Sequence, residues 1–412
     1  MPAPRKPRLR PVETIVVPDP RHGKVLVLRD TQGVAQGQAV LPPPLIPIVA
    51  RFSGRLTIGQ IARDASKELG GEVSEDLVEK IAEQLDEGLF LEGPTFERAL
   101  EKVRADFDAA PLRPASHAGG AYPGEEGELA AYIQRECLAP AAEPAPEGRM
   151  VALVAPHIDP WRGAIGYGHA YGALAKSLAP EIDTFVVFGT SHAPMREPFA
   201  LCRKGYDTPM GPMPVDGAFV DELAAAAEFD PYRDLLNHKR EHSIEFQAVF
   251  LKHLLGDRPA RIVPILAGLG DEQSTGRSPR RSPGVARFLD ALREGVQARS
   301  GRVVLVAGAD MAHVGPRFGD ATPHDAAKRD ALERTDRASL DFATRVDEGA
   351  FWEHVAADLE TRRVCGLAPV YSLLDALGAT AAGARGRVLH YEQNVDPDDG
   401  SIVSHAAVGF FA

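Results

Sequence analysis

The sequence predicts an α/β protein of two domains: a small winged-helix-like α+β domain over residues 1–110, and an α/β domain with a central mixed sheet over residues 111–412. Three observations support this fold class. The chain has 412 residues, more than one ordinary hydrophobic core usually holds. A short strand over residues 24–29 is followed by two helices with clear capping signals. From residue 151 onward, β-branched runs alternate with helical segments, which is typical of a sheet that is parallel in its middle.

The helices of the N-terminal domain are recognised by their first residues. Thr57 and Gln60 have the spacing of a capping box and open a helix over residues 57–69. Ser74 caps a second helix. The apolar stripe of this second helix is expected at Leu77, Ile81 and Leu85. A strand over residues 89–93 would complete a winged-helix arrangement.

The charge of this winged-helix-like segment argues against DNA binding. Between Thr57 and Glu92 the chain carries ten acidic and three basic residues. The phosphate backbone of a duplex would repel such a surface. We therefore expect a docking or packing module.

The second domain begins near Arg113. Residues 122–137 predict a turn followed by a helix, and residues 138–150 form a connector rich in proline and alanine. The segment 270–284 has no large apolar residue, so we expect a mobile surface loop whose basic run is solvated. The predicted strands are residues 151–154, 185–188, 262–266, 303–307, 388–391 and 406–411.

Composition excludes several classes of protein. The formal net charge of −12 argues against sequence-independent binding of nucleic acid. No apolar stretch is long enough to span a bilayer, and the basic N-terminus has no apolar run behind it, so we expect neither a membrane protein nor a secretory signal. The three cysteines are Cys137, Cys202 and Cys365. This sparse set indicates a reducing cytoplasm and no disulfide framework, and it offers no close cysteine pair for zinc.

Histidines follow three of the predicted strands. His157, His192 and His313 each lie beyond the carboxyl end of a different strand, and Asp310 precedes His313. In an open α/β sheet, ligands bind at this edge. A single histidine after a strand is usually structural, but three at equivalent positions indicate a functional site.

A helical segment adds further candidate residues. In "NHKREHSIEFQAVFLKHLL", His242 and Glu245 are three positions apart on one helical face. Glu241 and Glu245 are one turn apart and repel each other unless a cation or a cluster of donors compensates. His242 and Glu241 fit such a site, but they also fit a simple capping network at a helix start. The sequence leaves both interpretations open.

Imidazoles and carboxylates that meet in one pocket suit a first-row transition metal. Two histidines and a carboxylate are typical of non-haem Fe(II), whereas sets rich in histidine also suit zinc or copper. A carboxylate or carbonyl usually orients the second ring nitrogen of a ligating histidine. Asp159 and Asp310 are placed for that task, although sequence alone does not separate ligand from orienting group.

A set of collinear motifs connects the second domain to a known family. They are "RPASHAGGAYPGEEGEL", "VAPHIDPWRGAIGYGHAY", "FGTSHAP", "YDTPMGPMPVD", "REHSIEFQAVFL", "GADMAHVGPRFG", "RVCGLAPVYSLL" and "YEQNVDPDDGSIVSHAAVGFF". Residues from about 113 to 412 resemble the Memo family, whose bacterial members are called AmmeMemoRadiSam system protein B. The resemblance implies a fold similar to the LigB subunit of class III extradiol dioxygenases, which cleave aromatic diols with non-haem iron. It also implies that the corresponding pocket is a metal site or a relic of one.

The resemblance assigns roles to individual residues. His157 matches the first pocket histidine of the family, although this chain has "PHIDP" where the family usually has "PHAGY". His192 matches the second, and His242 matches the position of an acid/base histidine. These three are the implied metal ligands. His242, Asp310 and His313 are the implied catalytic residues.

The cysteine pattern departs from that of animal members. Their third ligand is expected in a segment like "SDFCHWG", where this chain has "ADMAHVG" with Ala312 at the cysteine position. The absence of this thiolate predicts a harder, oxygen-rich site completed by His242 or His313, with Asp310 and Glu241 as the candidates that supply negative charge. Cys365 matches another family cysteine and is expected to be structural.

The N-terminal domain resembles a different group of proteins. Its segments "GRLTIGQIA" and "VEKIAEQLDEGLF" are similar to PqqD-like domains, which hold peptides for radical-SAM enzymes. Two functions follow as expectations. The first is a metal- or peptide-holding protein that works with a radical-SAM enzyme and an AMMECR-type protein. The second is an iron-dependent oxidoreductase similar to extradiol dioxygenases. Fe(II) is the expected metal, with copper or zinc as alternatives.

Overall fold

A computed structural model describes residues 5–144 and 147–412 and divides the chain into two compact units. The first unit extends to Ala110, and residues 192–194 group with it. The second unit comprises Pro111–Ser191 and Met195–Ala412. Each unit has a hydrophobic core of its own.

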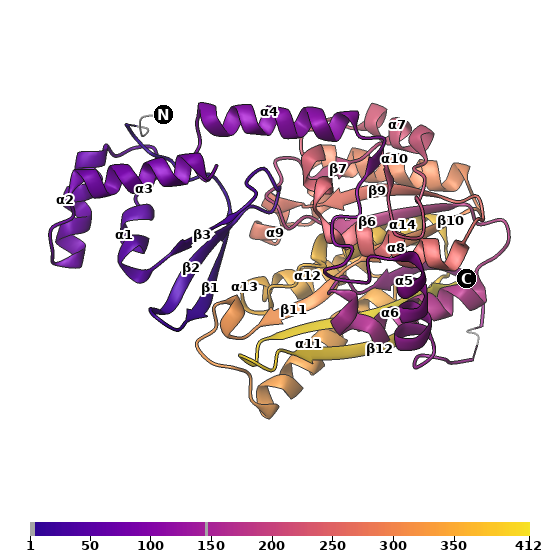
Figure 1. Cartoon of the computed structure of the whole chain (residues 1–412). Coiled ribbons are helices and arrows are strands. Elements are labelled where there is room, and N and C mark those ends of the chain that lie inside the picture. Colours follow the sequence, from indigo (N-terminus) through magenta and orange to yellow (C-terminus); the bar gives the residue numbers. More distant parts are fainter. Residues whose placement is uncertain (1–4, 145–146) are drawn as a thin grey trace. The chain divides into compact units, whose positions relative to one another are not determined.

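The first unit combines a small antiparallel sheet with helices (Figure 1). The sheet has the strand order β1-β2-β3, with β1 at Glu13–Asp19, β2 at Gly23–Arg29 and β3 at Gln38–Leu41. The helices are α1 (Ile46–Val49), α2 (Ile58–Leu69), α3 (Glu75–Glu87) and α4 (Pro94–Ala109). The predicted strand over residues 24–29 is confirmed as β2.

Both predicted helix caps are confirmed. The Thr57 side chain accepts a hydrogen bond from the backbone N–H of Gln60, and the Gln60 side chain accepts one from the backbone N–H of Thr57. Ser74 Oγ accepts from the backbone N–H of Leu77 at 3.2 Å. These bonds satisfy N–H groups that have no partner within the helix.

Two expectations for this unit are wrong. Leu77 is 40% exposed, because the buried face of α3 begins one position later, at Val78. Residues 89–93 form no strand: Leu89 takes a left-handed conformation with φ 65°, and Leu91 makes only an isolated bridge. A helix, α4, then begins at once, so the sheet of this unit lies before its helices in the sequence.

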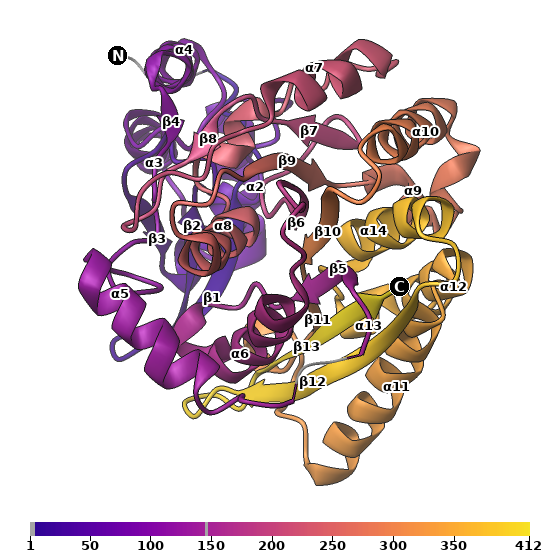
Figure 2. The same cartoon turned by 90° about the vertical axis from the view of Figure 1, so that its right-hand side faces the viewer.

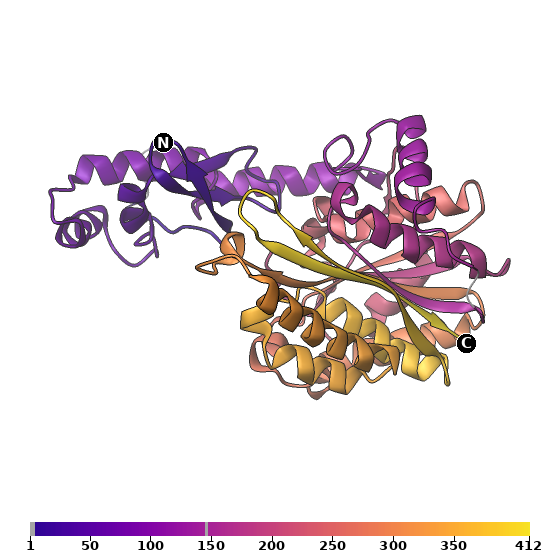
Figure 3. The ribbon, with the colours of Figure 1, turned by 90° about the horizontal axis from the view of Figure 1, so that it is seen from below.

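The second unit is built on a mixed sheet of eight strands in the order β11-β13-β5-β10-β6-β9-β7, with β12 paired to β13. The central strands β5, β10, β6 and β9 are parallel, as predicted, and the remaining ones are antiparallel. Figure 3 shows β12 and β13 as a long hairpin. The strands are β5 (Met150–Ala155), β6 (Thr184–Thr190), β7 (Phe199–Leu201), β9 (Arg261–Ala267), β10 (Val303–Gly308), β11 (Asp310–Val314), β12 (Arg385–Val395) and β13 (Ile402–Phe411). A separate pair joins β4 (Leu112–Arg113) to β8 (Gly205–Tyr206).

Helices cover both faces of this sheet (Figure 2). Alternating residues of each central strand enter two different cores: Phe185 and Val187 of β6 belong to one, and Val186 and Phe188 to the other. The first core includes α5 (Glu126–Tyr132), α6 (Pro160–Ser177) and α8 (His242–Leu255). The second includes α7 (Gly217–Ala226), α10 (Pro283–Ala298), α11 (Ala326–Thr344), α12 (Glu348–Ala356) and α14 (Leu367–Thr380). Two short helices, α9 (Gly270–Thr275) and α13 (Leu359–Arg362), complete the unit.

The segment expected to be a mobile loop is partly ordered. Residues 270–275 form α9, and Pro279–Arg281 form a 3₁₀ turn. Arg280 contacts Asp375 at 2.5 Å and Asp290 at 2.9 Å. Because Asp375 has no exposed side-chain surface, its charge needs a partner, and the basic run is therefore not simply solvated. In the predicted connector 138–150, residues 145–146 lie outside the described residues.

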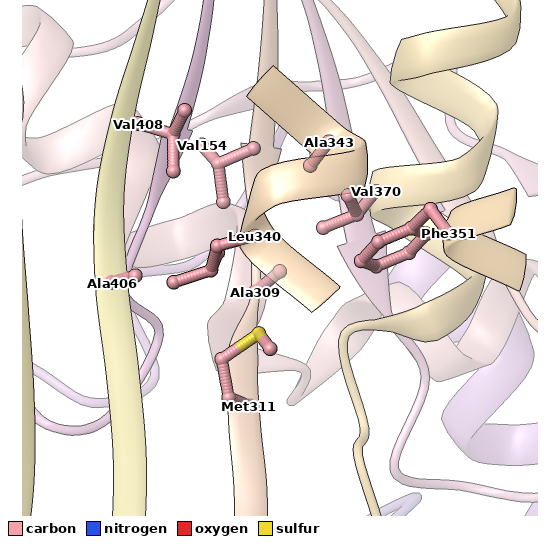
Figure 4. Close-up of a pocket in the computed structure, with 9 residues that line it drawn as sticks. All are labelled: Val154, Ala309, Met311, Leu340, Ala343, Phe351, Val370, Ala406 and Val408. Carbon is pink, nitrogen blue, oxygen red and sulfur yellow. The ribbon is translucent and has the colours of Figure 1, made fainter. Parts of the chain in front are cut away.

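A small apolar cavity lies in the second core (Figure 4). It is lined by Val154, Ala309, Met311, Leu340, Ala343, Phe351, Val370, Ala406 and Val408. None of these side chains has a strong hydrogen-bonding group, so the cavity is expected to be dry. No helix in the described residues is long and apolar enough to cross a membrane.

Candidate metal centre

The centre forms where parallel strands end. β5 ends at Ala155 and β10 ends at Gly308, and these two residues are register partners. His157 lies two residues beyond β5 and is 1% exposed. Its ring Nδ1 is 2.9 Å from the carbonyl oxygen of Gly308, and its backbone N–H donates to Asp310 Oδ1 at 2.8 Å. Both contacts orient the imidazole relative to the end of β10.

The contact with Gly308 determines which nitrogen of His157 can act as a ligand. A carbonyl oxygen only accepts, so Nδ1 carries a proton, and in the neutral ring Nε2 keeps its lone pair. Cys365 Sγ lies 3.2 Å from Nε2. Cys365 stands between α13 and α14, and its carbonyl oxygen accepts a hydrogen bond from Thr190 Oγ1 at the end of β6.

The position of Cys365 depends on the glycine that follows it. A side-chain carbon at Gly366 would collide with the carbonyl oxygen of Asp310. Glycine therefore allows the Cys365 loop to approach the end of β10. His192 follows β6, and its ring offers a nitrogen within 4.8 Å of the ligand atoms of His157 and Cys365.

His242, the first residue of α8, packs against the His157 ring. Glu241 is the N-cap of α8 and accepts a hydrogen bond from the backbone N–H of Ser243 at 3.0 Å. His242 Nδ1 lies 3.4 Å from Glu241 Oε1, and the rings of His157 and His242 meet edge to face at 5.4 Å. Glu241 is therefore a cap, as the simpler interpretation predicted. It also forms a second group of candidate ligands with His242 and His192.

Asp310 brings a buried negative charge to the centre. Its carboxylate oxygen Oδ2 is 3.6 Å from His157 Nε2. Burial by itself would raise the pKa of Asp310, but His157, His405 and His313 hold the pKa below its usual value. The carboxylate is therefore ionised at neutral pH and favours a cation nearby.

Glu245, a buried residue of α8, lies among several hydrogen-bond donors. Glu245 has no exposed surface. Its carboxylate accepts hydrogen bonds from Arg113 Nη1, Tyr122 OH, His117 Nδ1 and the backbone N–H of His117. Burial would raise the pKa of Glu245, but Arg113 and His117 lower it to about 2. These donors resolve the expected repulsion between Glu241 and Glu245.

Three sequence-predicted residues have other roles. Ala312 does not face the centre, because it packs with Val314, Leu332 and Ile402; the expectation that position 312 would face the metal is wrong. His313 packs edge to face on Phe318 at 5.1 Å and joins neither candidate ligand group. Asp159 is the N-cap of α6 and accepts from Arg162 N at 3.1 Å, so its carboxylate caps a helix.

Two residues in or beside this centre are not predicted as functional from the sequence. Cys365 was expected to be structural, although it lies next to His157. The sequence signal for Cys365 is the glycine that follows it, because Gly366 permits a close approach of this loop to the Asp310 backbone. His117 is not among the predicted residues, although it lies two positions before the pair Gly119–Gly120 and hydrogen-bonds to Glu245.

The site gathers histidine, cysteine and carboxylate side chains at the strand ends of a mixed α/β sheet. This arrangement defines a class of protein with a candidate transition-metal centre. The chain belongs to the Memo-like protein family, whose model matches residues 113–409. A MEMO1 family protein of Aquifex aeolicus is 27% identical over 391 residues, which is 95% of this chain and 97% of that protein. That alignment therefore extends over most of the first unit.

Two other relatives match a smaller share of the chain at a similar identity. A MEMO1 family protein of Thermus thermophilus is 30% identical and covers 71% of this chain and 81% of its own length. One of Thermococcus kodakarensis is 30% identical and covers 71% of this chain and 97% of its own length.

Proposed function

We propose that this Memo-family protein holds a redox or divalent metal ion through His157, His192 and Cys365. The observation that carries the proposal is the orientation of His157. Its Nδ1 donates to the carbonyl of Gly308, and its Nε2 lies 3.2 Å from the Cys365 sulfur. Ligating histidines typically donate their other ring N–H to a carbonyl or carboxylate in this way.

The donor set fits a transition metal. Around one zinc-like ion, nitrogen ligands lie about 2.0–2.1 Å and thiolate sulfur about 2.3 Å from the metal, so neighbouring ligand atoms are about 3–4 Å apart. The distance between His157 Nε2 and Cys365 Sγ falls within this range. A thiolate shifts the preference towards softer ions, so we propose Fe(II), copper or zinc rather than Mg²⁺ or Ca²⁺. When bound, such an ion supplies Lewis-acid or redox chemistry.

Two activities are compatible with this centre. In the first, the protein holds the metal or a peptide for a radical-SAM enzyme and an AMMECR-type partner. In the second, it is a non-haem iron oxidoreductase similar to the LigB-type dioxygenases, in which His242 holds or moves a proton near the bound substrate. Edge-to-face contact between the His242 and His157 rings supports the second activity. Oxygen uptake by iron-loaded protein with candidate substrates would separate the two.

Metal analysis tests the metal proposal directly. Protein purified without a histidine tag is expected to contain iron, copper or zinc, and the His157→Ala/His192→Ala double variant is expected to lose most of it. His253→Ala is the matched control, because His253 lies in the last turn of α8 and outside both ligand groups. Equal metal content in the double variant and the wild type would place the metal elsewhere.

For the first unit, we propose binding of a peptide or protein. Support comes from its separate core, which includes Ile61, Val78 and Ile81, and from its acidic helices. Exposed Val16 on β1 and Val40 on β3 give the small sheet apolar surface, at 52% and 54% exposure.

A fragment of residues 1–110 tests this second proposal. We expect it to unfold cooperatively in urea and to show no binding of duplex DNA at micromolar concentration, because its helices would repel phosphates. The full chain serves as the reference for both measurements. Salt-sensitive duplex binding by the fragment would contradict the proposal.

A further inference from the structure

An open pocket lies at the start of α6 and along the loop that carries His117. It offers about 420 Å³ of space, which is within the usual range for small-molecule sites. Its walls include His117, Asp159, Trp161 and the small residues Ala118, Gly120 and Ala121. This pocket is connected to the candidate metal centre by ring contacts, since His117 meets His242 at 5.6 Å and His242 meets His157 at 5.4 Å.

His117 presents one defined nitrogen to a ligand. Its Nδ1 is 2.8 Å from Glu245 Oε2, and its backbone N–H donates to Glu245 Oε1 at 2.9 Å. Arg113 keeps Glu245 ionised, so this carboxylate only accepts and His117 Nδ1 must donate. His117 Nε2 makes no hydrogen bond within the described residues, and in the neutral ring it is an acceptor.

Trp161 supplies a flat apolar wall. Its side chain is 47% exposed, yet it is held in place by a hydrogen bond from Nε1 to the carbonyl of Gly120 at 2.8 Å. Tyr132 packs against it edge to face at 4.8 Å. A large aromatic side chain that is both fixed and exposed is typical of a surface that stacks on a ligand ring.

The charges of the pocket restrict what it can bind. No lysine or arginine lines it within the described residues. Asp159, the single formal charge in the lining, is paired with Arg162 at 2.5 Å. An anion would therefore find no lysine or arginine in the lining, whereas a neutral ligand with an N–H or O–H group would find the acceptor at His117.

We propose that this pocket binds an uncharged planar molecule that stacks on Trp161 and donates an N–H or O–H hydrogen bond to His117 Nε2. The inference rests on the proposed function, because it assigns the substrate class of the proposed metal centre. His117 acts as the residue that positions this molecule, and Glu245 acts through His117 by holding its tautomer.

Three related aromatic probes test the proposal in metal-free protein, so that direct binding to the metal does not contribute. Benzamide has the ring and the N–H donor, N,N-dimethylbenzamide lacks the donor, and benzoate is an anion. We expect saturable quenching of Trp161 fluorescence by benzamide, and dissociation constants about fivefold to tenfold higher for the other two probes, as for the loss of one hydrogen bond. The second tryptophan, Trp352, is 1% exposed and should not respond.

Variants identify the groups involved. His117→Ala should raise the dissociation constant of benzamide about fivefold to tenfold, because one hydrogen bond is lost. Benzamide and the dimethyl probe should then bind with similar affinity. His117→Gln, which keeps an acceptor, should restore part of the difference. His253→Ala is the control and should bind benzamide like the wild type. For Trp161→Ala, which removes the fluorescent reporter, saturation-transfer NMR should show weaker binding.

The proposal is overturned if benzoate binds as well as benzamide, or if His117→Ala keeps the preference for the donor. A loss of metal content in His117→Ala would also overturn it, since His117 would then be a ligand. The two probe outcomes do not depend on whether His157, His192 and Cys365 hold a metal, which is measured separately in the wild type.

Discussion

Replacing Cys365 with serine is expected to lower the affinity for Zn(II) by about 100-fold or more, since loss of an orienting partner already costs about 10–100-fold. The physical reason is that a serine hydroxyl stays protonated at neutral pH, whereas a metal-bound cysteine is a thiolate. A competitive chelator titration measures the affinity. In the Co(II) form, the thiolate-to-metal charge-transfer absorbance should disappear.

The other cysteines provide the control for this prediction. Burial raises the pKa of Cys202 to about 11 and that of Cys137 to about 12, so both thiols stay protonated. Cys202→Ala should leave the Co(II) spectrum and the Zn(II) affinity unchanged. If Cys365→Ser bound zinc like the wild type, Cys365 would not be a ligand. Its role would then be structural, as the sequence predicts.

Removing the buried Glu245 carboxylate is expected to destabilise the second unit strongly. Glu245→Ala leaves Arg113 as an uncompensated buried charge, and breaking such a pair costs about 3–5 kcal/mol. The double variant Arg113→Met/Glu245→Leu should recover a large part of this loss, because it removes both charges. Urea unfolding measures both effects.

A surface pair provides the matched comparison. Glu222 contacts Arg299 at 2.8 Å, but its side chain is 54% exposed. Glu222→Ala should therefore change stability by about 0–1 kcal/mol. An equally small effect for Glu245→Ala would show that the buried cluster contributes little.

The same carboxylate predicts how stability depends on pH. The pKa of Glu245 falls from its ordinary value of 4.5 to about 2 in the folded protein. The unfolded chain therefore binds the proton more readily, and folding is stabilised at pH values above about 4.5. This contribution is lost as the pH falls from about 4.5 towards 2. Glu245→Gln should show a flatter stability profile in that range.

Local patterns in the sequence predicted much of the fold. Thr57 and Ser74 signal helix starts, because capping chemistry involves only neighbouring residues. The strands β5, β6, β9 and β10 are visible as apolar runs, since buried parallel strands must be apolar on both faces. The strand expected over residues 89–93 failed because Leu89 takes a left-handed conformation, for which leucine gives no signal.

The candidate site was only partly predictable. His157 and His192 follow strands whose parallel order could be anticipated, so their common edge could be predicted from the sequence. Ala312 was aligned to a position that faces a different cluster, because β11 leaves the parallel part of the sheet and pairs antiparallel with β13. Alignment of motifs could not show that reversal.

The sequence by itself determined the fold class, the strand-end histidines and the helix caps at Thr57 and Ser74, since each depends on a short range of neighbouring residues. The tertiary structure alone decided that Cys365 is the thiol next to His157, although 208 positions separate the two in the chain. It also decided that Glu245 orients His117, which lies 128 positions away. Contacts at such separations depend on how the strands and helices pack, and neither residue's local sequence carries that information.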